Sequence, residues 1–317
     1  MDGMTNAARD AEAASSIGRA QRTLKSAICC VGIGLHSGAR VHVTLRPAAA
    51  GTGIVFRRID LGVDVPARFD HVVDTLMCTV LAAPGQPDVR VGTVEHLMAA
   101  LAGCGITNIV AELDGAELPV LDGSAAPWMF LLDCAGTVAQ EDAVTVVEVL
   151  RPVRVTDGAA SAELRPGAGL HMAMAIEFAA GAIGRQALSL SIDGAVIRHE
   201  LAEARTFTML DEVAALQAAG LARGGSLDNA IVVDGARVLN PGGLRMTEEF
   251  VRHKMLDAVG DLALAGVALQ GRFVGHCSGH SLNNRVLRAL FADPANYRVV
   301  PAPDLAGEWV PATLQAA

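Results

Sequence analysis

Three polar side chains at four-residue intervals stand in the mostly apolar segment 251–261: His253, Asp257 and Asp261. Side chains four residues apart lie on one face of a helix, so this spacing predicts a polar stripe along a helix. An imidazole and a carboxylate one turn apart supply two of the three protein ligands of a catalytic zinc site, whose fourth position holds water. His96 and His280 are candidates to complete such a site.

Two histidines and a carboxylate form a donor set that suits zinc. If His96, His253 and Asp257 are the ligands, a bound zinc ion polarises a carbonyl group and lowers the pKa of its water to about 7. The same ligands accept Fe2+. Glu95 directly precedes His96 and is therefore placed to act as general base toward that water. The predicted chemistry is metal-assisted hydrolysis.

Hydrolysis of an amide also needs an acid for the departing amine. His280 lies in a glycine-containing turn and has a suitable intrinsic pKa. Asp261, one turn after Asp257, is placed to orient His280 or to keep it protonated. Lys254 supplies positive charge for a developing oxyanion or for a substrate phosphate.

Each of these segments, taken alone, also has a more ordinary interpretation. A Glu-His pair at a helix start is typical of capping, and a His-Lys-x-x-Asp helix is typical of a solvated face with i,i+4 pairing. An internal match favours the site: residues 94–98 align without gaps with residues 251–255, and Gly103 aligns with Gly260. The match predicts a duplicated unit whose two copies face each other, so that His96 and His253 converge.

Short valine-rich strands alternate with helices rich in alanine and leucine, which predicts an α+β fold. Helices are expected at residues 94–101 and 196–204, and strands at residues 41–45, 108–113, 144–149, 151–155, 188–192 and 230–234. The polar stretch 135–142 is interpreted as a linker, which gives a first domain at residues 21–139 and a second at residues 140–317, with an insert around residues 180–216. Residues 1–20 lack the apolar run of a signal peptide, and we expect a disordered extension there.

Composition restricts the class of protein. The 317 residues carry a formal net charge of −9, which argues against nucleic acid as a partner, because neutralising phosphates needs a basic surface. No apolar run approaches the ~20 residues of a transmembrane helix. The six cysteines lack CxxC spacing, so we expect a reduced, cytoplasmic protein. A monomer that acts on a small molecule is expected.

Other enzyme classes are disfavoured by their motifs. The glycines of residues 32–38 have GxGxxxG spacing and precede a strand, so a tight turn with His36 at its tip is a better interpretation than a dinucleotide loop. The sequence contains no Gly-x-Ser-x-Gly elbow of a serine hydrolase. It also lacks the HExxH motif of zinc peptidases.

A series of sequence blocks then carries a family resemblance. The blocks run in one order along most of the chain, at residues 21–25, 32–38, 74–79, 93–97, 121–127, 204–207, 224–226, 250–257 and 278–284. Through them the chain resembles the UDP-3-O-acyl-N-acetylglucosamine deacetylases, the zinc enzymes of the committed step in bacterial lipid A synthesis. The resemblance implies two related layered sandwich domains, each with a small insert, and an active site between them.

The resemblance also implies roles for particular residues. It places zinc on His96, His253 and Asp257. It makes Glu95 the general base and His280 the general acid, supported by Asp261. It implies that Thr206 and Lys254 stabilise the oxyanion. It also implies that Phe207 and Cys78 contact the substrate. The insert around residues 180–216 would form an apolar passage for the acyl chain, which gains roughly 0.8 kcal/mol per buried CH2.

The chain departs from the family pattern at two places on the expected substrate side. Family members commonly carry Phe-x-His-Pro where this chain has Phe178 followed by Ala-Ala-Gly, and often lysine where it has Cys277. Arg185, Arg205 and Arg272 are the candidates to compensate. The prediction is a zinc-dependent amidase that releases acetate from UDP-3-O-(3-hydroxyacyl)-N-acetylglucosamine. The alternative is a catalytically silent protein of the same fold that binds the UDP-sugar or the acyl chain.

Overall fold

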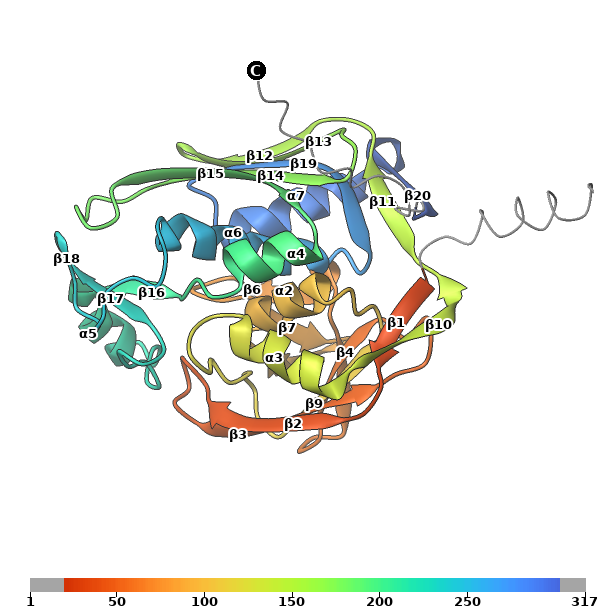
Figure 1. The fold of residues 1–317 in the computed structure, drawn as a ribbon, viewed down its shortest axis with the longest axis horizontal. Helices are drawn as coiled ribbons and strands as arrows, with labels where there is room; N and C mark the ends of the chain where they lie inside the picture. The colour runs from red at the N-terminus through yellow and green to blue at the C-terminus, as the bar shows by residue number, and fades with distance from the viewer. Residues whose placement is uncertain (1–19, 303–317) are drawn as a thin grey trace, which may run out of the picture.

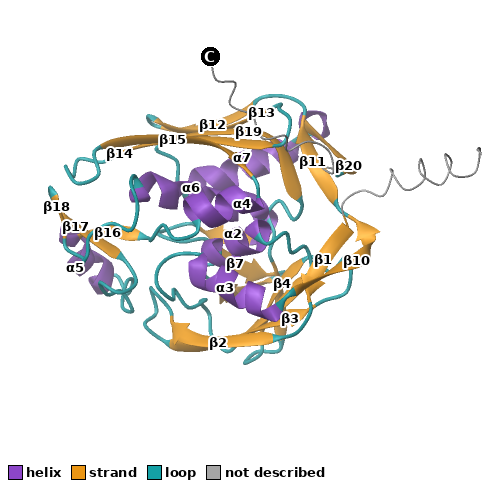
Figure 2. Cartoon of the chain, viewed as in Figure 1, coloured by secondary structure: helices purple, strands orange, loops and turns teal. Residues whose placement is uncertain are grey.

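Two sheets form outer layers of the molecule, and helices lie between them (Figures 1 and 2). The computed structural model describes residues 20–302. The predicted disordered extension therefore lies outside the described residues, except for Ala20, which begins strand β1. Among residues 20–302, no helix is both long enough and apolar enough to cross a membrane. The mixture of helices and sheets confirms the predicted α+β class.

The first half of the chain is built on a five-stranded sheet in the order β2-β3-β9-β4-β5. In β3 (Arg40–Pro47), the buried residues Val41, Val43 and Leu45 alternate with more exposed polar ones, as expected of a sheet with one face in the core. The other strands are β2 (Ile28–Ile33), β4 (Ile54–Arg58), β5 (Val63–Pro66) and β9 (Ile109–Leu113). Helices α2 (Glu95–Gly103) and α3 (Ala126–Ala135) lie on the inner side of this sheet (Figure 1).

Smaller elements flank this layer. A three-stranded sheet contains β6 (Val72–Asp74), β7 (Val80–Ala83) and β8 (Gln86–Val91), and a 3-10 turn (Phe69–His71) precedes it. Strand β1 (Ala20–Leu24) pairs with β10 (Thr137–Ala143). The polar stretch interpreted as a linker is thus largely strand β10, and most of its residues are exposed.

The second half is built on a seven-stranded sheet. Its central strand β19 (Ala268–His276) pairs with β13 on one side and with β11 and β14 on the other. The remaining members are β11 (Thr145–Val149), β12 (Val153–Asp157), β13 (Ala160–Arg165), β14 (Leu170–Glu177), β15 (Arg185–Ile192) and β20 (Tyr297–Pro301). Helices α6 (Glu249–Ala263) and α7 (His280–Ala292) lie on its inner side, and a 3-10 turn (Pro294–Asn296) follows α7.

The separate small sheet of this half begins within the last part of the range 180–216, in which the insert was predicted. Strand β15 lies in that range but forms a hairpin with β14 in the large sheet. The small three-stranded sheet contains β16 (Phe207–Met209), β17 (Ile231–Asp234) and β18 (Arg237–Val238), and helix α5 (Leu210–Ala218) packs on it. Between the two sheets, α4 (Gly194–Val196) continues into a π-helical turn (Ile197–Leu201) that contacts α2 and α6.

Candidate active site

Helices α2 and α6 pack against each other at the centre of the molecule and bring the predicted metal ligands together. His96 lies in the first turn of α2, and His253 and Asp257 lie one turn apart on α6. The ring centroids of the two histidines are 5.1 Å apart. Asp257 Oδ1 lies 3.6 Å from His96 Nε2 and 3.3 Å from His253 Nε2. All three side chains are buried, and one ligand atom from each lies within 4.8 Å of the others.

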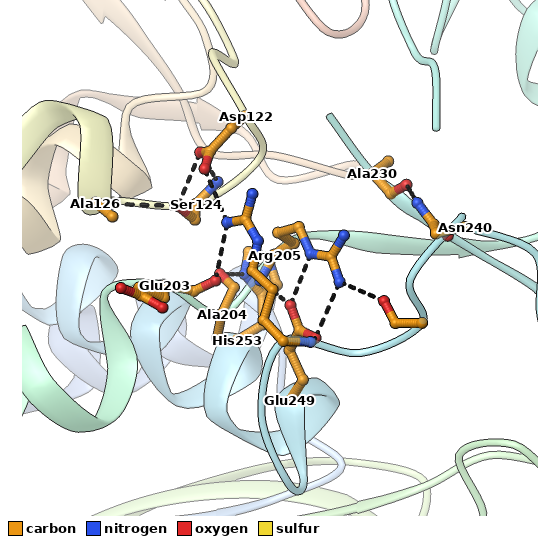
Figure 3. A network of polar contacts seen from close by, with 12 residues as sticks. Asp122, Ser124, Ala126, Glu203, Ala204, Arg205, Ala230, Asn240, Glu249 and His253 are labelled. Atoms are coloured by element: carbon orange, nitrogen blue, oxygen red, sulfur yellow. Dashed lines mark hydrogen bonds and ion pairs between the residues drawn. The ribbon is translucent and has the colours of Figure 1, made fainter. Parts of the chain in front are cut away.

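The hydrogen bonds around this cluster indicate that a cation, rather than a proton shared by His253 and Asp257, would lie between these two side chains. Nδ1 of His253 lies 3.0 Å from the carbonyl oxygen of Ala204, which can only accept, so Nδ1 carries the proton (Figure 3). Burial lowers the pKa of His253 to about 4, so the ring is neutral near pH 7 and its Nε2 presents a lone pair. That lone pair faces Asp257 Oδ1, a buried oxygen that receives no hydrogen bond from any described residue. Two acceptors facing each other are repulsive unless a positive charge lies between them.

The second oxygen of Asp257 is held by Lys254. Its Nζ donates to Asp257 Oδ2 at 2.9 Å. Burial opposes ionisation, yet the His253 imidazole and the Lys254 ammonium hold the pKa of Asp257 well below its usual range. Burial lowers the pKa of His96, but the Asp257 carboxylate more than offsets this, and the net pKa is raised. Asp257 is therefore an ionised group whose free oxygen points at both histidines.

Glu95 lies beside this cluster and has the properties of a proton acceptor. It is the first residue of α2, and its side chain is buried. Thr79 N–H donates to Glu95 Oε2 at 3.1 Å, and Glu95 Oε1 lies 3.9 Å from His280 Nε2. Burial raises the pKa of Glu95, although the positive charges of His280 and His96 oppose the change. A carboxylate with a raised pKa takes up a proton more readily than an exposed one.

His280 begins α7 and is held by an aspartate on α6. Nδ1 of His280 lies 2.9 Å from Asp261 Oδ2. Burial alone would lower the pKa of His280, but the charge of Asp261 and this hydrogen bond raise it to about 9, so the imidazolium persists near pH 7. Two residues that spacing arguments missed complete the arrangement, because Asp261 also accepts from Thr79 Oγ1 at 2.6 Å and from Asn283 Nδ2 at 2.9 Å. The i,i+3 relation of His280 and Asn283 is a signal that could have revealed the second of them.

Strained backbone precedes each of the three helices that carry these residues. Thr93, Glu248 and Cys277 have φ values of 56°, 56° and 47°, in the left-handed region that is costly for a residue with a side chain. They come just before α2, α6 and α7 respectively. Such conformations persist only where the surrounding structure enforces them, and they are common at functional sites.

Comparison with known proteins decides the family. Residues 21–292 match the LpxC family model, described as UDP-3-O-acyl N-acetylglycosamine deacetylase. A protein of Myxococcus xanthus named UDP-3-O-acyl-N-acetylglucosamine deacetylase is 48% identical over 284 residues, covering 89% of this chain and 90% of its own length. A protein of the same name from Phenylobacterium zucineum is 49% identical over 282 residues, covering 88% of this chain and 96% of its own length. The chain belongs to the UDP-3-O-acyl-N-acetylglucosamine deacetylase family.

The resemblance to the deacetylase family also predicted roles for Phe207 and Thr206. The Phe207 ring is 6.2 Å from the His253 ring and also packs edge-on against Phe178 and Phe250. Thr206 is partly exposed and is fixed by its backbone: its N–H donates to the Gly123 carbonyl, and its own carbonyl accepts from the N–H of the residue that begins β17.

The surroundings of Cys78 and of the three candidate arginines limit what these side chains can do. Cys78 is buried, and burial together with the charge of Glu95 raises the pKa of its thiol, so the thiol stays protonated. Among the three arginines considered as substitutes for missing substrate contacts, Arg205 is already bound to Glu249 inside the protein. Arg185 and Arg272 are exposed, on β15 and β19.

Proposed function

We propose that this protein is a zinc-dependent hydrolase that removes acetate from the 2-acetamido group of UDP-3-O-(3-hydroxyacyl)-N-acetylglucosamine, the committed step of lipid A synthesis. The names of its relatives support this substrate. The observation that carries the proposal is the position of Glu95 and His280: their facing atoms are 3.9 Å apart, and both groups border the His96, His253 and Asp257 cluster. A base and an acid at this separation can serve opposite ends of one reacting amide.

The cluster fits a divalent metal ion. Nε2 of His96, Nε2 of His253 and Oδ1 of Asp257 would hold it, and the missing donor at Asp257 Oδ1 supports this assignment. Bound zinc would supply a Lewis acid that polarises the acetamide carbonyl and increases the acidity of water. Fe2+ suits the same ligands.

Glu95 and His280 each carry out one of the two proton transfers. Glu95 takes the proton of the attacking water, which its raised pKa favours. His280 enters the reaction protonated, because Asp261 holds its pKa at about 9, and it gives the proton from Nε2 to the departing amine. Glu95 and His280 thus act as a base and an acid whose pKa values match their tasks.

The remaining residues position the substrate in this proposal. Thr206 and Lys254 stabilise the oxyanion, and the ammonium of Lys254 also restrains Asp257. Phe207 packs against the sugar or the acyl group, and Cys78 is a further substrate contact. The acyl chain runs along the small sheet of the second half, where Leu210, Leu227 and Leu244 are exposed in or beside its connections.

Acetate release from UDP-3-O-(3-hydroxyacyl)-N-acetylglucosamine tests the proposal, with zinc content measured on the same sample. We expect turnover that follows zinc occupancy. Glu95→Gln should keep the metal and lower kcat by about 10²–10⁴-fold. A folded, zinc-loaded protein that binds the substrate without releasing acetate would instead favour the silent binding protein. Nearly full activity in Glu95→Gln would remove that residue as the base.

A further inference from the structure

A buried ion pair lies one helical turn from His253. Arg205 and Glu249 are 7% and 0% exposed, and Arg205 Nε donates to Glu249 Oε1 at 2.8 Å (Figure 3). Arg205 Nη2 donates to Glu249 Oε2 at 3.2 Å and to the Gly243 carbonyl at 2.9 Å. Two backbone N–H groups also donate to the Glu249 carboxylate. The N–H of Arg205 donates to Oε1 at 3.1 Å, and the N–H of Arg245 donates to Oε2 at 2.7 Å. Every group that contacts Glu249 here is a donor, so both oxygens of this side chain act as hydrogen-bond acceptors.

This pair and His253 hold the same short segment of chain. Glu249 and His253 are four residues apart on α6 and therefore lie on one face of the helix. Glu249 binds the backbone and the side chain of Arg205, and His253 Nδ1 donates to the carbonyl of the preceding residue, Ala204. The position of that carbonyl is thus set by the ion pair next to it.

The network also reaches the first half of the chain. Arg245 Nη1 donates to Asp122 Oδ2 at 2.8 Å. The other oxygen of Asp122 accepts from the backbone and the hydroxyl of Ser124 (Figure 3). Arg245 Nη1 also donates to the Glu203 carbonyl at 3.2 Å. The segment 203–205 is therefore held between α6 and the loop that precedes α3.

We propose that Arg205 and Glu249 are positioning residues: their ion pair holds the Ala204 carbonyl as the acceptor for His253 Nδ1–H and so fixes the His253 tautomer whose Nε2 faces Asp257. The importance of this tautomer for a metal ion rests on the proposed function, in which His253 is a ligand. A group that accepts from the second nitrogen of a ligand histidine sets the tautomer and the orientation of the ring. Neither member of the pair lies in the ligand cluster, so in this proposal the pair acts on the site through this carbonyl.

Three variants separate this role from support of the fold. Glu249→Gln places an amide donor against other donors, and Arg205→Lys keeps the charge but loses the planar fork. The double variant Arg205→Met/Glu249→Leu replaces the pair by apolar groups, which often leaves stability unchanged or improved. Glu200→Gln is the matched control, because it removes the ion pair between Arg252 of α6 and Glu200 of the π-helical turn without touching residues 204–205.

The experiment uses the full-length protein and zinc, without substrate. Long-range 1H–15N spectra of metal-free, histidine-labelled protein report the His253 tautomer, and competition with a chelator reports the zinc dissociation constant. We expect wild type and Glu200→Gln to show protonated Nδ1 and equal zinc affinity. The folded pair variants, the apolar double variant included, should show mixed tautomers and roughly 10–100-fold weaker zinc binding.

Two results would overturn the proposal. One is a folded pair variant with the wild-type tautomer and zinc affinity within twofold of wild type. The other is loss of folding in all three pair variants, which would make the pair a requirement of the fold. Failure of the proposed function is seen separately, because it would appear as a wild-type protein that releases no acetate while its tautomer spectrum stays measurable.

Discussion

Gly260 of α6 lies directly against the backbone carbonyl of Glu95 on α2. A Cβ atom at position 260 would be 2.0 Å from the Glu95 oxygen and 2.8 Å from its carbonyl carbon. The obstructing atoms belong to the backbone, so they cannot rotate away as the end of a side chain can. The absence of a side chain at Gly260 therefore allows the helix of the proposed base to pack on the helix of the proposed ligands.

Gly260→Ala should separate these two helices. The added methyl group forces a backbone shift, and overpacking of this kind costs about 1–3 kcal/mol of unfolding free energy. The shift moves Glu95 away from His280, and a displacement of about 1 Å can lower turnover by about 10²-fold. Thermal unfolding and acetate release on one preparation measure both effects. Gly181→Ala is the control for the unfolding measurement, because a Cβ there meets only ordinary contacts, the nearest at 3.6 Å; equal stability of the two variants would contradict the prediction.

Asp261→Asn should change the pH dependence of the reaction. His280 must be protonated to act as an acid, so the rate should fall as pH rises through the His280 pKa of about 9. Loss of the Asp261 charge removes the main contribution that raises this pKa, and a carboxylate partner typically shifts a pKa by about 1–3 units. The alkaline limb of kcat/KM should therefore move to lower pH. A variant with an unchanged limb would show that another group controls it.

The same ionisation should be visible in the stability of the metal-free protein. The pKa of His280 is about 9 in the fold, above the ~6.5 of a free imidazole. Its stabilising contribution is therefore complete below about pH 6.5 and is lost as pH rises through about 9. Urea unfolding between these two pH values should show falling stability in wild type. Asp261→Asn should show a smaller fall, and an equal fall in both proteins would count against His280 as the source.

The sequence allowed us to predict the residues of the candidate site, but not most of the residues that hold them in place. Helical spacing placed His253, Asp257 and Asp261 on one face, because a helix fixes which residues are neighbours. It did not reveal that Thr79 binds Asp261, since that contact joins residues 182 positions apart and depends on how the two halves pack. The Arg205–Glu249 pair was missed because its members lie 44 positions apart, beyond the reach of helical spacing.

Strand patterns had a similar limit. The alternation at residues 188–192 predicted a strand, and β15 is there. Alternation does not tell which sheet a strand joins, and the pairing of β15 with β14 placed it in the large sheet. The left-handed backbone of Glu248 also left no trace in the sequence, because it occurs at a residue other than glycine.

Thr79→Val should weaken the support of Asp261 while preserving side-chain shape. The variant removes the 2.6 Å bond from Thr79 Oγ1 to the buried carboxylate, and a hydrogen bond to a charged group contributes about 1.5–3 kcal/mol. Stability should fall by an amount of this order, and kcat should fall more than the affinity for substrate. Thr156→Val is the control, since Thr156 is exposed on β12. Wild-type kcat and stability in Thr79→Val would show that Asp261 does not depend on this bond.

If a metal ion binds at the proposed site, its removal should destabilise the protein through the binding equilibrium. A ligand that binds only the folded state at 100 times its dissociation constant stabilises that state by about 2.7 kcal/mol. In the metal-free protein, the buried Asp257 Oδ1 faces the lone pair of His253 Nε2 and accepts no hydrogen bond from the described residues. A chelator should therefore lower the melting temperature of wild type, and added zinc should restore it. His253→Ala should respond to neither treatment, because its ligand set is incomplete. A wild-type melting temperature that is unchanged by chelator and by zinc would count against a metal ion at this cluster.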